Sequence, residues 1–541
     1  MVVILYASIE WAGNSTFMEV LGSIEPDWNC TLKNGSYYTV RAPTNDKSCK
    51  KTVEFVSLVA DFKMICNDAD KVKWIEVIQA GGSLYPSNLN PKQLRVEARN
   101  QDKNVISKLV GSIFGGHMGD YFGRKTMFFI GQLFIIITSI MSTASRNWIA
   151  YAFIQGMNCF LYGVIEVTSL TMMMEYTNNK YRIVMASAFQ WPIAYIVISL
   201  IAFLTKGWQN FFVFLNLVSS PLTIGFMLFH ESPRWLIATG KLDKACSVLN
   251  DIAHQRWNNT KARFTTTDIS FIHKSDKKRC YTFYHLFSSP RLAKQSLMQI
   301  LSMFTYALVT NTYLCTVGRV HDSAIMFIFL DGIFRLFTPF IIIFLDLYIP
   351  RFGRKIQFIG ALVLEAVLFG IIILLISNGY DYNVTIPVII SIMINDCVFW
   401  INIVQITTQR YPTVIRSIAF GSLHSIKHLG SIAAILVVTP LLSSWTLGAF
   451  VIPEIFVIIT IVIGLFLQPE TKGKALMDQM VEANYGRLEN ELAAGHKVAQ
   501  MELRDKYRRE LEAVQSANRA GHEIDSPWNF RESFQQQCFR W

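Results

Sequence analysis

Three basic side chains fall close together in an otherwise apolar stretch of the sequence: His424, Lys427 and His428. On a helix, residues 424 and 428 lie one turn apart, and residue 427 lies beside 428. A charge inside a lipid bilayer is costly unless it is paired or hydrated, so such residues are candidates for function. A basic cluster in a low-dielectric interior would attract an anionic group. Alternatively, Lys427 pairs with Asp396 or Glu365, or extends toward water, and the site stays neutral.

Other charged residues interrupt apolar segments and are candidates for substrate binding or coupling: Glu166, Asp331, Arg335, Glu365 and Asp396. Asp331 and Arg335 are four residues apart with the acid first, which is the spacing of an ion pair on one helix face. A purely structural pair fits this spacing as well as a pair that contacts a substrate. The other three are single acids, and we expect each to face either a cavity or a hydrogen-bond partner.

The residue patterns predict no catalytic residue, no metal site and no cofactor. The nine cysteines are scattered and form no Cys-x-x-Cys pair. No Gly-rich phosphate-binding loop ending in Gly-Lys-Ser/Thr occurs, so we do not expect ATP to drive the protein. We therefore expect a protein that is not an enzyme.

Composition indicates how these charges are held in place. Hydrophobic residues make up 52% of the 541-residue chain and charged residues only 16%. Ten apolar runs are each about long enough to cross a bilayer, and they are apolar all round rather than on one face. The runs are 126–145, 149–172, 184–205, 209–229, 296–317, 324–349, 356–377, 384–404, 417–442 and 446–467. We predict an all-α polytopic membrane protein.

The distribution of Lys and Arg predicts its orientation. Alternate connections between the runs are rich in bases, and residues 231–294 alone hold twelve. By the positive-inside rule, the rich side is cytoplasmic. The net charge of +11 is therefore mainly a topology signal, and we expect no nucleic-acid partner.

The first hundred residues have a different character. Residues 1–24 are apolar but contain Glu10 and Asn14, which predicts a partial first helix. Residues 25–104 predict an extracellular loop, and 83–104 within it are polar enough to indicate an insertion. The loop carries cysteines and two N-glycosylation triplets that fit an oxidising environment: Cys30, Cys49, Cys66, Asn29 and Asn34.

The remaining chain divides into two helical halves and two polar parts. We expect an N-terminal half over 105–230 with helices two to six, a cytoplasmic loop over 231–294, a C-terminal half over 295–467 with helices seven to twelve, and a cytoplasmic tail over 468–541. Helix two is in question, because the apolar run before residue 118 is short for a span.

A compact charged turn runs from Gly116 to Lys125. Gly116 permits close contact between helices, and Gly123 can take a positive φ at the turn. Asp120 can pair with Arg124, or it can sit at a neighbouring helix N-terminus, where negative charge is favoured. The pattern returns as Pro350-Arg351-Phe352-Gly353-Arg354-Lys355, which fits two related halves.

These motifs carry a resemblance to a known family. The turn, together with Glu231-Ser232-Pro233-Arg234-Trp235-Leu236 and Pro469-Glu470-Thr471-Lys472-Gly473, resembles the major facilitator superfamily. Within it, the chain resembles the organic cation/anion/zwitterion transporter family of solute carriers. The segments after helices four and ten, Glu175–Arg182 and Arg410–Arg416, are similar to that family as well. The resemblance covers about residues 110–480.

The resemblance implies a twelve-helix fold of two six-helix halves and a cytoplasmic latch built on the charged turn. It implies gating or conformational roles for Gly116, Asp120, Gly123, Arg124, Lys125, Glu175, Arg182, Glu231, Arg234, Arg351, Arg354, Lys355 and Glu470. Pro350 stands where the family usually has Asp, so the second copy of the latch is expected to be weaker. His428 stands where resembling cation carriers have Asp and resembling anion carriers have Arg.

The resemblance also implies a substrate-binding wall on helices four, five, seven, ten and eleven: Tyr162, Gln190, Phe304, Tyr306, Trp400, Lys427 and His428. We predict a secondary transporter of small organic cations or anions that works by alternating access in a lipid bilayer. Facilitated diffusion and exchange both fit. A non-transporting, receptor-like or inactive member of the same family is the alternative, and a sugar-type facilitator fits the segment after helix six less well. We expect a multi-pass plasma-membrane protein with both termini cytoplasmic if the first helix is complete; no oligomeric state is predicted.

Overall fold

The computed structural model describes residues 95–177, 190–226, 230–256, 263–270, 281–317, 324–349, 352–379, 384–472 and 476–477, together with short segments before residue 62. Most of the expected first helix, the insertion up to residue 94 and the tail beyond residue 477 lie outside these residues.

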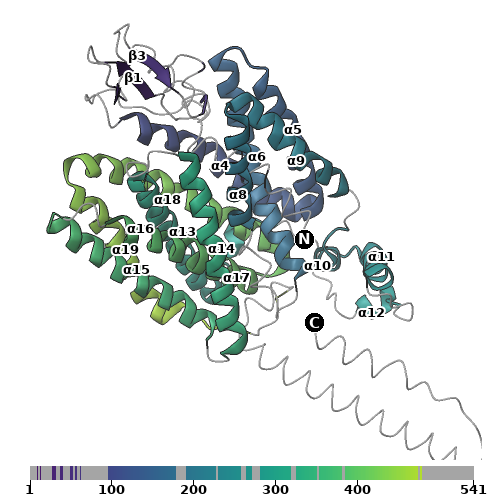
Figure 1. Cartoon of the computed structure of the whole chain (residues 1–541). Helices are drawn as coiled ribbons and strands as arrows, with labels where there is room; N and C mark the ends of the chain where they lie inside the picture. Colours follow the sequence, from purple (N-terminus) through teal and green to yellow (C-terminus); the bar gives the residue numbers. More distant parts are fainter. Residues whose placement is uncertain are drawn as a thin grey trace, which may run out of the picture.

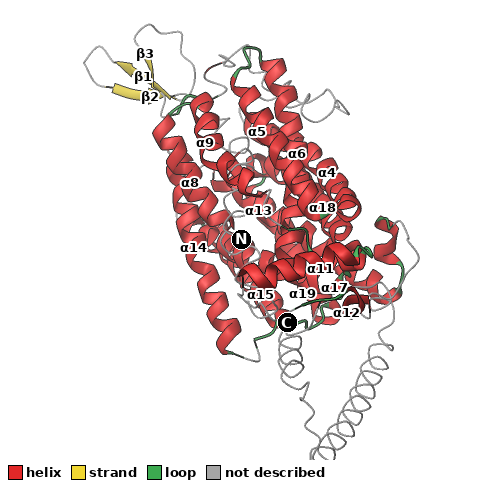
Figure 2. Cartoon of the chain, turned by 90° about the vertical axis from the view of Figure 1, so that its right-hand side faces the viewer, coloured by secondary structure: helices red, strands yellow, loops and turns green. Residues whose placement is uncertain are grey.

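Long helices form the N-terminal half. They are α4 (Arg95–Phe122), α5 (Arg124–Thr143), α6 (Trp148–Tyr176), α8 (Gln190–Thr205) and α9 (Trp208–Phe226). Short elements follow: α10 (Pro233–Ala238), α11 (Leu242–Asp251), a π-helical turn (Ile252–Arg256), α12 (Thr266–Ser270) and a 3₁₀ turn (Phe283–Phe287). Figures 1 and 2 show α11 and α12 at one end of the helix bundle.

The C-terminal half repeats the long-helix arrangement. Its helices are α13 (Pro290–Val317), α14 (Ala324–Tyr348), α15 (Arg354–Ser377), α16 (Thr385–Met393), α17 (Trp400–Arg410), α18 (Arg416–Ser444) and α19 (Thr446–Leu467). A 3₁₀ turn (Thr413–Ile415) leads into α18. The last predicted apolar run, 446–467, has the same bounds as α19.

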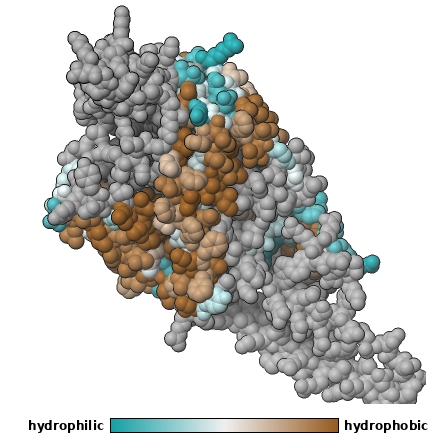
Figure 3. Space-filling model, viewed as in Figure 1, coloured by the Kyte–Doolittle hydropathy of each residue, from teal (hydrophilic) through white to brown (hydrophobic). Residues whose placement is uncertain are grey.

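Seven helices among the described residues are long and apolar enough to cross a membrane, and Trp191–Thr205 forms a shorter apolar helix. Figure 3 shows an apolar surface over the flank of the bundle. Large side chains such as Phe340, Phe344 and Leu374 are more than half exposed. A continuous apolar exterior of this kind faces lipid rather than water. The prediction of an all-α polytopic membrane protein is confirmed for the bundle.

The structure differs from the sequence expectations at three places. A three-stranded antiparallel sheet of order β2-β1-β3 forms before the bundle, from β1 (Asp27–Thr31), β2 (Tyr37–Val40) and β3 (Cys49–Thr52). It lies at the end of the bundle opposite α11 (Figure 2). Its register places Cys30 opposite Cys49. Hydrogen bonds between the strands satisfy the backbone N–H and C=O groups of this polar segment, so it forms a sheet and not a helix.

The second difference is the start of α4. The helix begins at Arg95 rather than at residue 105, so residues 95–104, which we assigned to the extracellular loop, extend the second helix. A polar sequence continues a helix without difficulty, because helix formation depends on backbone hydrogen bonds and not on hydropathy. The third difference lies in the apolar run 384–404, where the π-helical segment Ile394–Phe399 separates α16 from α17. Such segments are frequent at functional sites.

The two halves pack closely along two helix pairs, α4 with α18 and α8 with α14. Gly116 allows the first approach, as expected: a Cβ there would lie 2.8 Å from the carbonyl oxygen of Ser417 and 3.1 Å from the Cα of Gly421. One continuous core cluster draws its buried apolar residues from both halves. The halves therefore share one interior, and the charged residues described next lie where they meet.

Candidate functional site

Four charged side chains meet at the end of the bundle that carries α10. Arg124 Nη2 lies 2.7 Å from Asp120 Oδ1 and 3.3 Å from Glu175 Oε1. Arg416 Nη1 donates to Glu175 Oε1 at 3.0 Å. We name Asp120, Arg124, Glu175 and Arg416 the basic-end network. All four are buried, and two carboxylates balance two guanidinium groups, the condition under which buried charges are tolerated.

The basic-end network joins the two halves. Asp120 Oδ2 accepts a hydrogen bond from the backbone N–H of Ile418 at 2.9 Å, and Arg124 Nη2 donates to the carbonyl oxygen of Thr413 at 2.7 Å. Asp120 thus does both things expected of it, since it pairs with Arg124 and also lies at the N-terminus of α18. In this conformation the halves are held together at the basic end.

Two glutamates cap equivalent helices in the two halves. Glu231 accepts from the backbone N–H of Lys125 at 3.1 Å, at the N-terminus of α5. Glu470 accepts from the backbone N–H groups of Arg354 at 2.9 Å and Lys355 at 3.2 Å, at the N-terminus of α15. A carboxylate at a helix N-terminus meets unpaired N–H groups and the positive end of the helix dipole. The segments after helices six and twelve are therefore structural counterparts.

A glycine precedes each capped helix, and each lies against its glutamate. Gly123 has φ +114°, as expected, and a Cβ there would lie 2.4 Å from Glu231 Oε2. A Cβ on Gly353 would lie 2.0 Å from Glu470 Oε2. Although burial opposes its ionisation, backbone N–H groups of Lys472 and Arg354 hold the pKa of Glu470 below its usual value of 4.5.

The remaining latch residues support these contacts. Trp235 of α10 donates its indole N–H to the Asp120 carbonyl oxygen at 2.9 Å, and the Arg124 guanidinium lies 5.7 Å from its ring centroid. Arg234 is half-buried in the same short helix. Lys355 Nζ donates to the Leu465 carbonyl oxygen at 2.8 Å.

The second copy of the turn has a carboxylate partner for Arg354 that the sequence prediction did not include. Arg354 Nη1 and Nη2 donate to Asp346 Oδ1 at 2.9 Å and Oδ2 at 3.1 Å. Lys472 Nζ lies 3.5 Å from the same carboxylate. Asp346, one turn before Pro350, thus supplies the carboxylate that position 350 lacks. The sequence prediction considered position 350 alone and did not include this acid.

The basic cluster of helix eleven meets a single acid of helix four. Lys427 Nζ of α18 lies 2.5 Å from Glu166 Oε1 of α6. His424 Nδ1 and His428 Nε2 lie 3.2 Å and 3.8 Å from Glu166 Oε2. The partner of Lys427 is therefore neither Asp396 nor Glu365. We name Glu166, His424, Lys427 and His428 the central cluster; it joins the halves as the basic-end network does.

A second lysine adds charge beside the central cluster. Lys108 of α4 is 4% exposed, and its ammonium lies 4.8 Å from the ring centroid of Tyr162. We did not single out Lys108 as functional; the available signal was that it interrupts an apolar run, which in a membrane protein marks a functional candidate.

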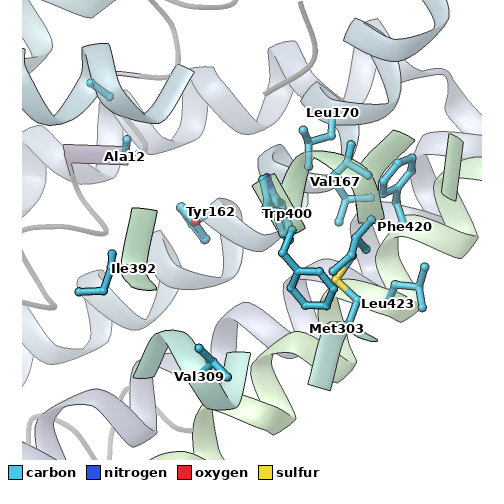
Figure 4. Packing of buried hydrophobic residues seen from close by; sticks show 14 of the residues in the cluster. Ala12, Tyr162, Val167, Leu170, Met303, Val309, Ile392, Trp400, Phe420 and Leu423 are labelled. Atoms are coloured by element: carbon cyan, nitrogen blue, oxygen red, sulfur yellow. The ribbon is translucent and has the colours of Figure 1, made fainter. Parts of the chain in front are cut away.

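Aromatic residues surround these charges. Lys427 Nζ lies 5.2 Å from the ring of Trp400, and Tyr306 packs on Trp400 at 4.8 Å between centroids. Figure 4 shows Tyr162 and Trp400 among the buried residues of the interior. Phe304 instead packs against Phe456 of α19 at 5.4 Å, within the C-terminal half. Of the expected wall, Tyr162, Tyr306, Trp400, Lys427 and His428 come together, and Phe304 does not.

A second charged group consists of Asp331, Arg335 and Asp396. Arg335 Nε donates to Asp331 Oδ1 at 2.8 Å, which is the expected pair, and Arg335 Nη1 lies 2.5 Å from Asp396 Oδ2. Asp396 lies in the π-helical segment and also accepts from Thr310 Oγ1 at 2.9 Å. The guanidinium lies 5.4 Å from the ring of Tyr195 in α8, so this group also contacts the N-terminal half. Two acids here share one guanidinium among the described residues.

Glu365 has a different kind of partner. Its Oε1 accepts a hydrogen bond from Tyr313 Oη at 2.8 Å and another from Ser391 Oγ. It is 2% exposed, and the described residues provide no ion pair to it. Of the two outcomes that we expected for a single acid, Glu365 has the hydrogen-bond partner.

Some predicted residues cannot be placed in this way. Gln190 begins α8, but its side chain lies outside the described residues, as do Arg182, Arg351 and Asn34. Asn29 lies in β1. The roles assigned to these five residues remain predictions.

A helical membrane bundle of two halves that meet at buried, paired charges, with a capped charged turn in each half, has the architecture of a major facilitator transporter. The family model described as "Sugar (and other) transporter" matches residues 104–482, and the chain belongs to this family. The resemblance found in the motifs is confirmed.

Curated relatives and solved structures agree with this assignment. The chain is 23% identical over 388 residues to solute carrier family 22 member 2 of Rattus norvegicus, covering 70% of this chain and 67% of that protein. It is 24% identical over 442 residues to the uncharacterized protein F23F12.3 of Caenorhabditis elegans, covering 77% and 79%. The fold is similar to the inward-open xylose transporter XylE from E. coli (TM-score 0.55, 14% identity, 89% of this chain and 98% of that chain). It is also similar to the human organic anion transporter MFSD10 (TM-score 0.54, 12% identity, 86% and 98%).

Proposed function

We propose that this transporter carries small organic ions by alternating access, with the substrate bound beside the central cluster. The observation that carries the proposal is the ion pair between Glu166 of one half and Lys427 of the other. The two atoms are 2.5 Å apart, and the side chains of Glu166 and Lys427 are 3% and 14% exposed. A charged pair across the moving interface must be broken or replaced when the halves separate. An ionic substrate can take the place of one member of the pair, because its charge then pairs with the side chain that would otherwise be left without a counter-charge.

The basic-end network defines the state seen here as closed at the basic end. Opening that end separates Asp120 from Ile418 and Glu175 from Arg416. Breaking a buried ion pair is strongly unfavourable unless both partners find new ones. Substrate binding and water entry would compensate this cost. Transport then follows from an equilibrium between a state closed at the basic end and a state closed at the opposite end. We assign the basic end to the cytoplasm of a plasma-membrane protein, because of its Lys and Arg excess.

An anionic group fits the central cluster better than a cationic one. The central cluster gathers Lys427 and two imidazoles around the single carboxylate of Glu166. These basic side chains would attract a carboxylate, sulfonate or phosphate in the low-dielectric interior. Tyr306 and Trp400 provide an aromatic wall for the rest of the substrate. The names of the solute carrier family 22 relatives favour this kind of solute carrier over a sugar-type facilitator.

Transport of organic cations is a second candidate, and one observation favours it. Asp331 and Asp396 share the single guanidinium of Arg335, which leaves negative charge near Tyr306 and Tyr195. A cation could bind there by Coulomb attraction and by cation–π contact.

Uptake in cells that express the full chain tests the proposal. Labelled organic anions and cations are compared at equal surface expression, with Lys427→Ala and with Lys244→Ala as the control, since Lys244 is an exposed residue of α11. Lys427→Ala removes a charged hydrogen bond, which contributes about 1.5–3 kcal/mol. We therefore expect a roughly tenfold or larger loss of anion uptake in Lys427→Ala and no loss in Lys244→Ala. Saturable uptake of neither kind of ion, despite surface delivery, would favour the non-transporting alternative instead.

A further inference from the structure

The two halves end α6 and α17 in the same way. Glu175 is the penultimate residue of α6, and Gln409 is the penultimate residue of α17. The residue that follows each helix has nearly the same backbone conformation: Thr177 has φ −99° and ψ 136°, and Tyr411 has φ −99° and ψ 130°. Gln409 is therefore the counterpart of Glu175 in the C-terminal half.

The neighbouring helices agree with this relation. Arg124 is the first residue of α5 and Arg354 is the first residue of α15, and each follows a glycine that lies against a capping glutamate. Within the N-terminal half α5 contacts α6, and within the C-terminal half α15 contacts α17. The relation predicts that position 409 lies toward the Arg354 end of α15, as Glu175 lies against Arg124.

The two related positions differ in charge. Glu175 Oε1 lies 3.3 Å from Arg124 Nη2 and 3.0 Å from Arg416 Nη1, so one carboxylate links a base of its own half to a base of the other half. Gln409 is neutral and 7% exposed, and its Oε1 has no hydrogen-bond partner among the described residues. A buried carbonyl oxygen without a partner is destabilising, so this amide calls for an explanation other than packing.

The C-terminal half has fewer acids at this end than the N-terminal half. Arg354 and Lys472 both contact Asp346, and the described residues bring no second carboxylate within ion-pair distance of either base. In the basic-end network, by contrast, two carboxylates meet two guanidinium groups. The acid that the C-terminal half lacks is the one at position 409.

We propose that Gln409 is a positioning residue that weakens the closure of the basic end. A carboxylate at this place would pair across the interface as Glu175 does, and the neutral amide removes that second contact. Because opening then breaks fewer buried ion pairs, the basic end opens more readily than it would with an acid at position 409. The inference rests on the proposed alternating access and identifies a residue that controls one of its steps.

Gln409→Glu in the full chain, combined with a Ser417→Cys reporter, tests this inference. Ser417 is fully buried where α18 meets α4, so its modification by a membrane-impermeant thiol reagent follows opening of the basic end. The reagent is added on the side that the basic end faces, and labelling of the chain without the reporter is subtracted. A charged hydrogen bond across the interface predicts that Gln409→Glu slows the labelling about tenfold or more.

Gln209→Glu is the matched control, because it makes the same chemical change at an exposed residue near the start of α9. This end of α9 is the one farthest from α10 and the basic end. We expect the labelling rate of Gln209→Glu to equal that of the parent protein.

Moving the acid from one half to the other separates this role from damage to packing. Glu175→Gln is expected to speed the labelling. Adding Gln409→Glu to that variant restores the number of carboxylates at the basic end and is expected to bring the rate back toward that of the parent. Damage to packing at both positions would make the double variant label fastest and would overturn the inference. Should Gln409→Glu alone not accumulate in the membrane, Gln409→Asp and the double variant carry the same decision.

Uptake of labelled benzenesulfonate and tetraethylammonium gives an independent readout. Stabilising the state that is closed at the basic end lowers the maximal rate of Gln409→Glu. It does not raise KM, because the state that binds substrate from the opposite side becomes more populated. Labelling of Gln409→Glu as fast as that of the parent overturns the inference and leaves the proposed function intact. Uptake of neither ion by the parent overturns the proposed function, whereas the labelling rates still decide whether position 409 controls the closure.

Discussion

The carboxylate of Asp120 in α4 accepts a hydrogen bond from the backbone N–H of Ile418 in α18, at 2.9 Å and across 298 residues of sequence. The acid of one half thus caps the first turn of a helix in the other half. The same carboxylate pairs with Arg124 at 2.7 Å. One side chain therefore couples the charged turn to the closure of the basic end.

Asp120→Asn is expected to favour opening of the basic end. The amide can still accept from Ile418, but Arg124 loses a buried anionic partner, and breaking a buried pair costs about 3–5 kcal/mol. A cysteine at Ser417, which is fully buried against α4, reports the opening by its rate of modification from the side of the membrane that the basic end faces. We expect faster labelling of the Asp120→Asn protein.

Asp243→Asn provides the control for this measurement, since Asp243 is an exposed acid at the start of α11. It is expected to leave the labelling rate unchanged. Equal labelling of all three proteins would show that Asp120 does not hold the basic end closed.

Glu470→Gln is expected to destabilise the protein by about 1 kcal/mol at neutral pH, because it weakens a carboxylate cap on α15. The pKa of Glu470 is lowered in the folded state, so its contribution is present above pH 4.5 and is lost as the pH falls further. Thermal unfolding in detergent should separate wild type from Glu470→Gln at pH 7, and the difference should shrink below pH 4.5. A difference that grows on acidification would contradict the assignment.

Local spacing predicted much of the fold and of the basic-end network. The Asp120–Arg124 pair, the positive φ of Gly123 and the Asp331–Arg335 pair each depend on residues within one or two turns, where helix geometry fixes the distances. The bounds of α19 followed from hydropathy alone, because an all-apolar run has few competing structures in lipid.

Long-range partners could not be predicted in this way. Glu166 and Lys427 are 261 residues apart, and only the packing of α6 and α18 selects this pair over Asp396 or Glu365. Asp346 was missed because the comparison with the family motif considered only position 350. Arg354 can pair with any carboxylate within reach of its guanidinium group, and here that carboxylate is Asp346. The π-helical segment at Asp396 is defined by its backbone hydrogen bonds, and hydropathy carries no information about that pattern.

Asp346→Asn is expected to destabilise the C-terminal half. Arg354 is 5% exposed, and both of its terminal nitrogens donate hydrogen bonds to Asp346. The ammonium group of Lys472 lies near the same carboxylate. Leaving the guanidinium without a buried counter-charge costs about 3–5 kcal/mol. The unfolding temperature in detergent checks this, with Asp243→Asn again as the control. A change no larger than in the control would mean that the second copy of the turn depends on other contacts.

The ion pair between Glu166 and Lys427 is best tested by a double-mutant cycle. Lys427→Ala leaves Glu166 buried without its ammonium partner, and Glu166→Gln leaves Lys427 without its carboxylate, so each single change is expected to cost about 3–5 kcal/mol. The double variant removes both charges together and should cost less than the sum of the two single changes, by a coupling of about 1–3 kcal/mol. Thermal unfolding of the four proteins measures the coupling. Additive single effects would show that the charges act independently, and the substrate would then have no interhelical ion pair to replace.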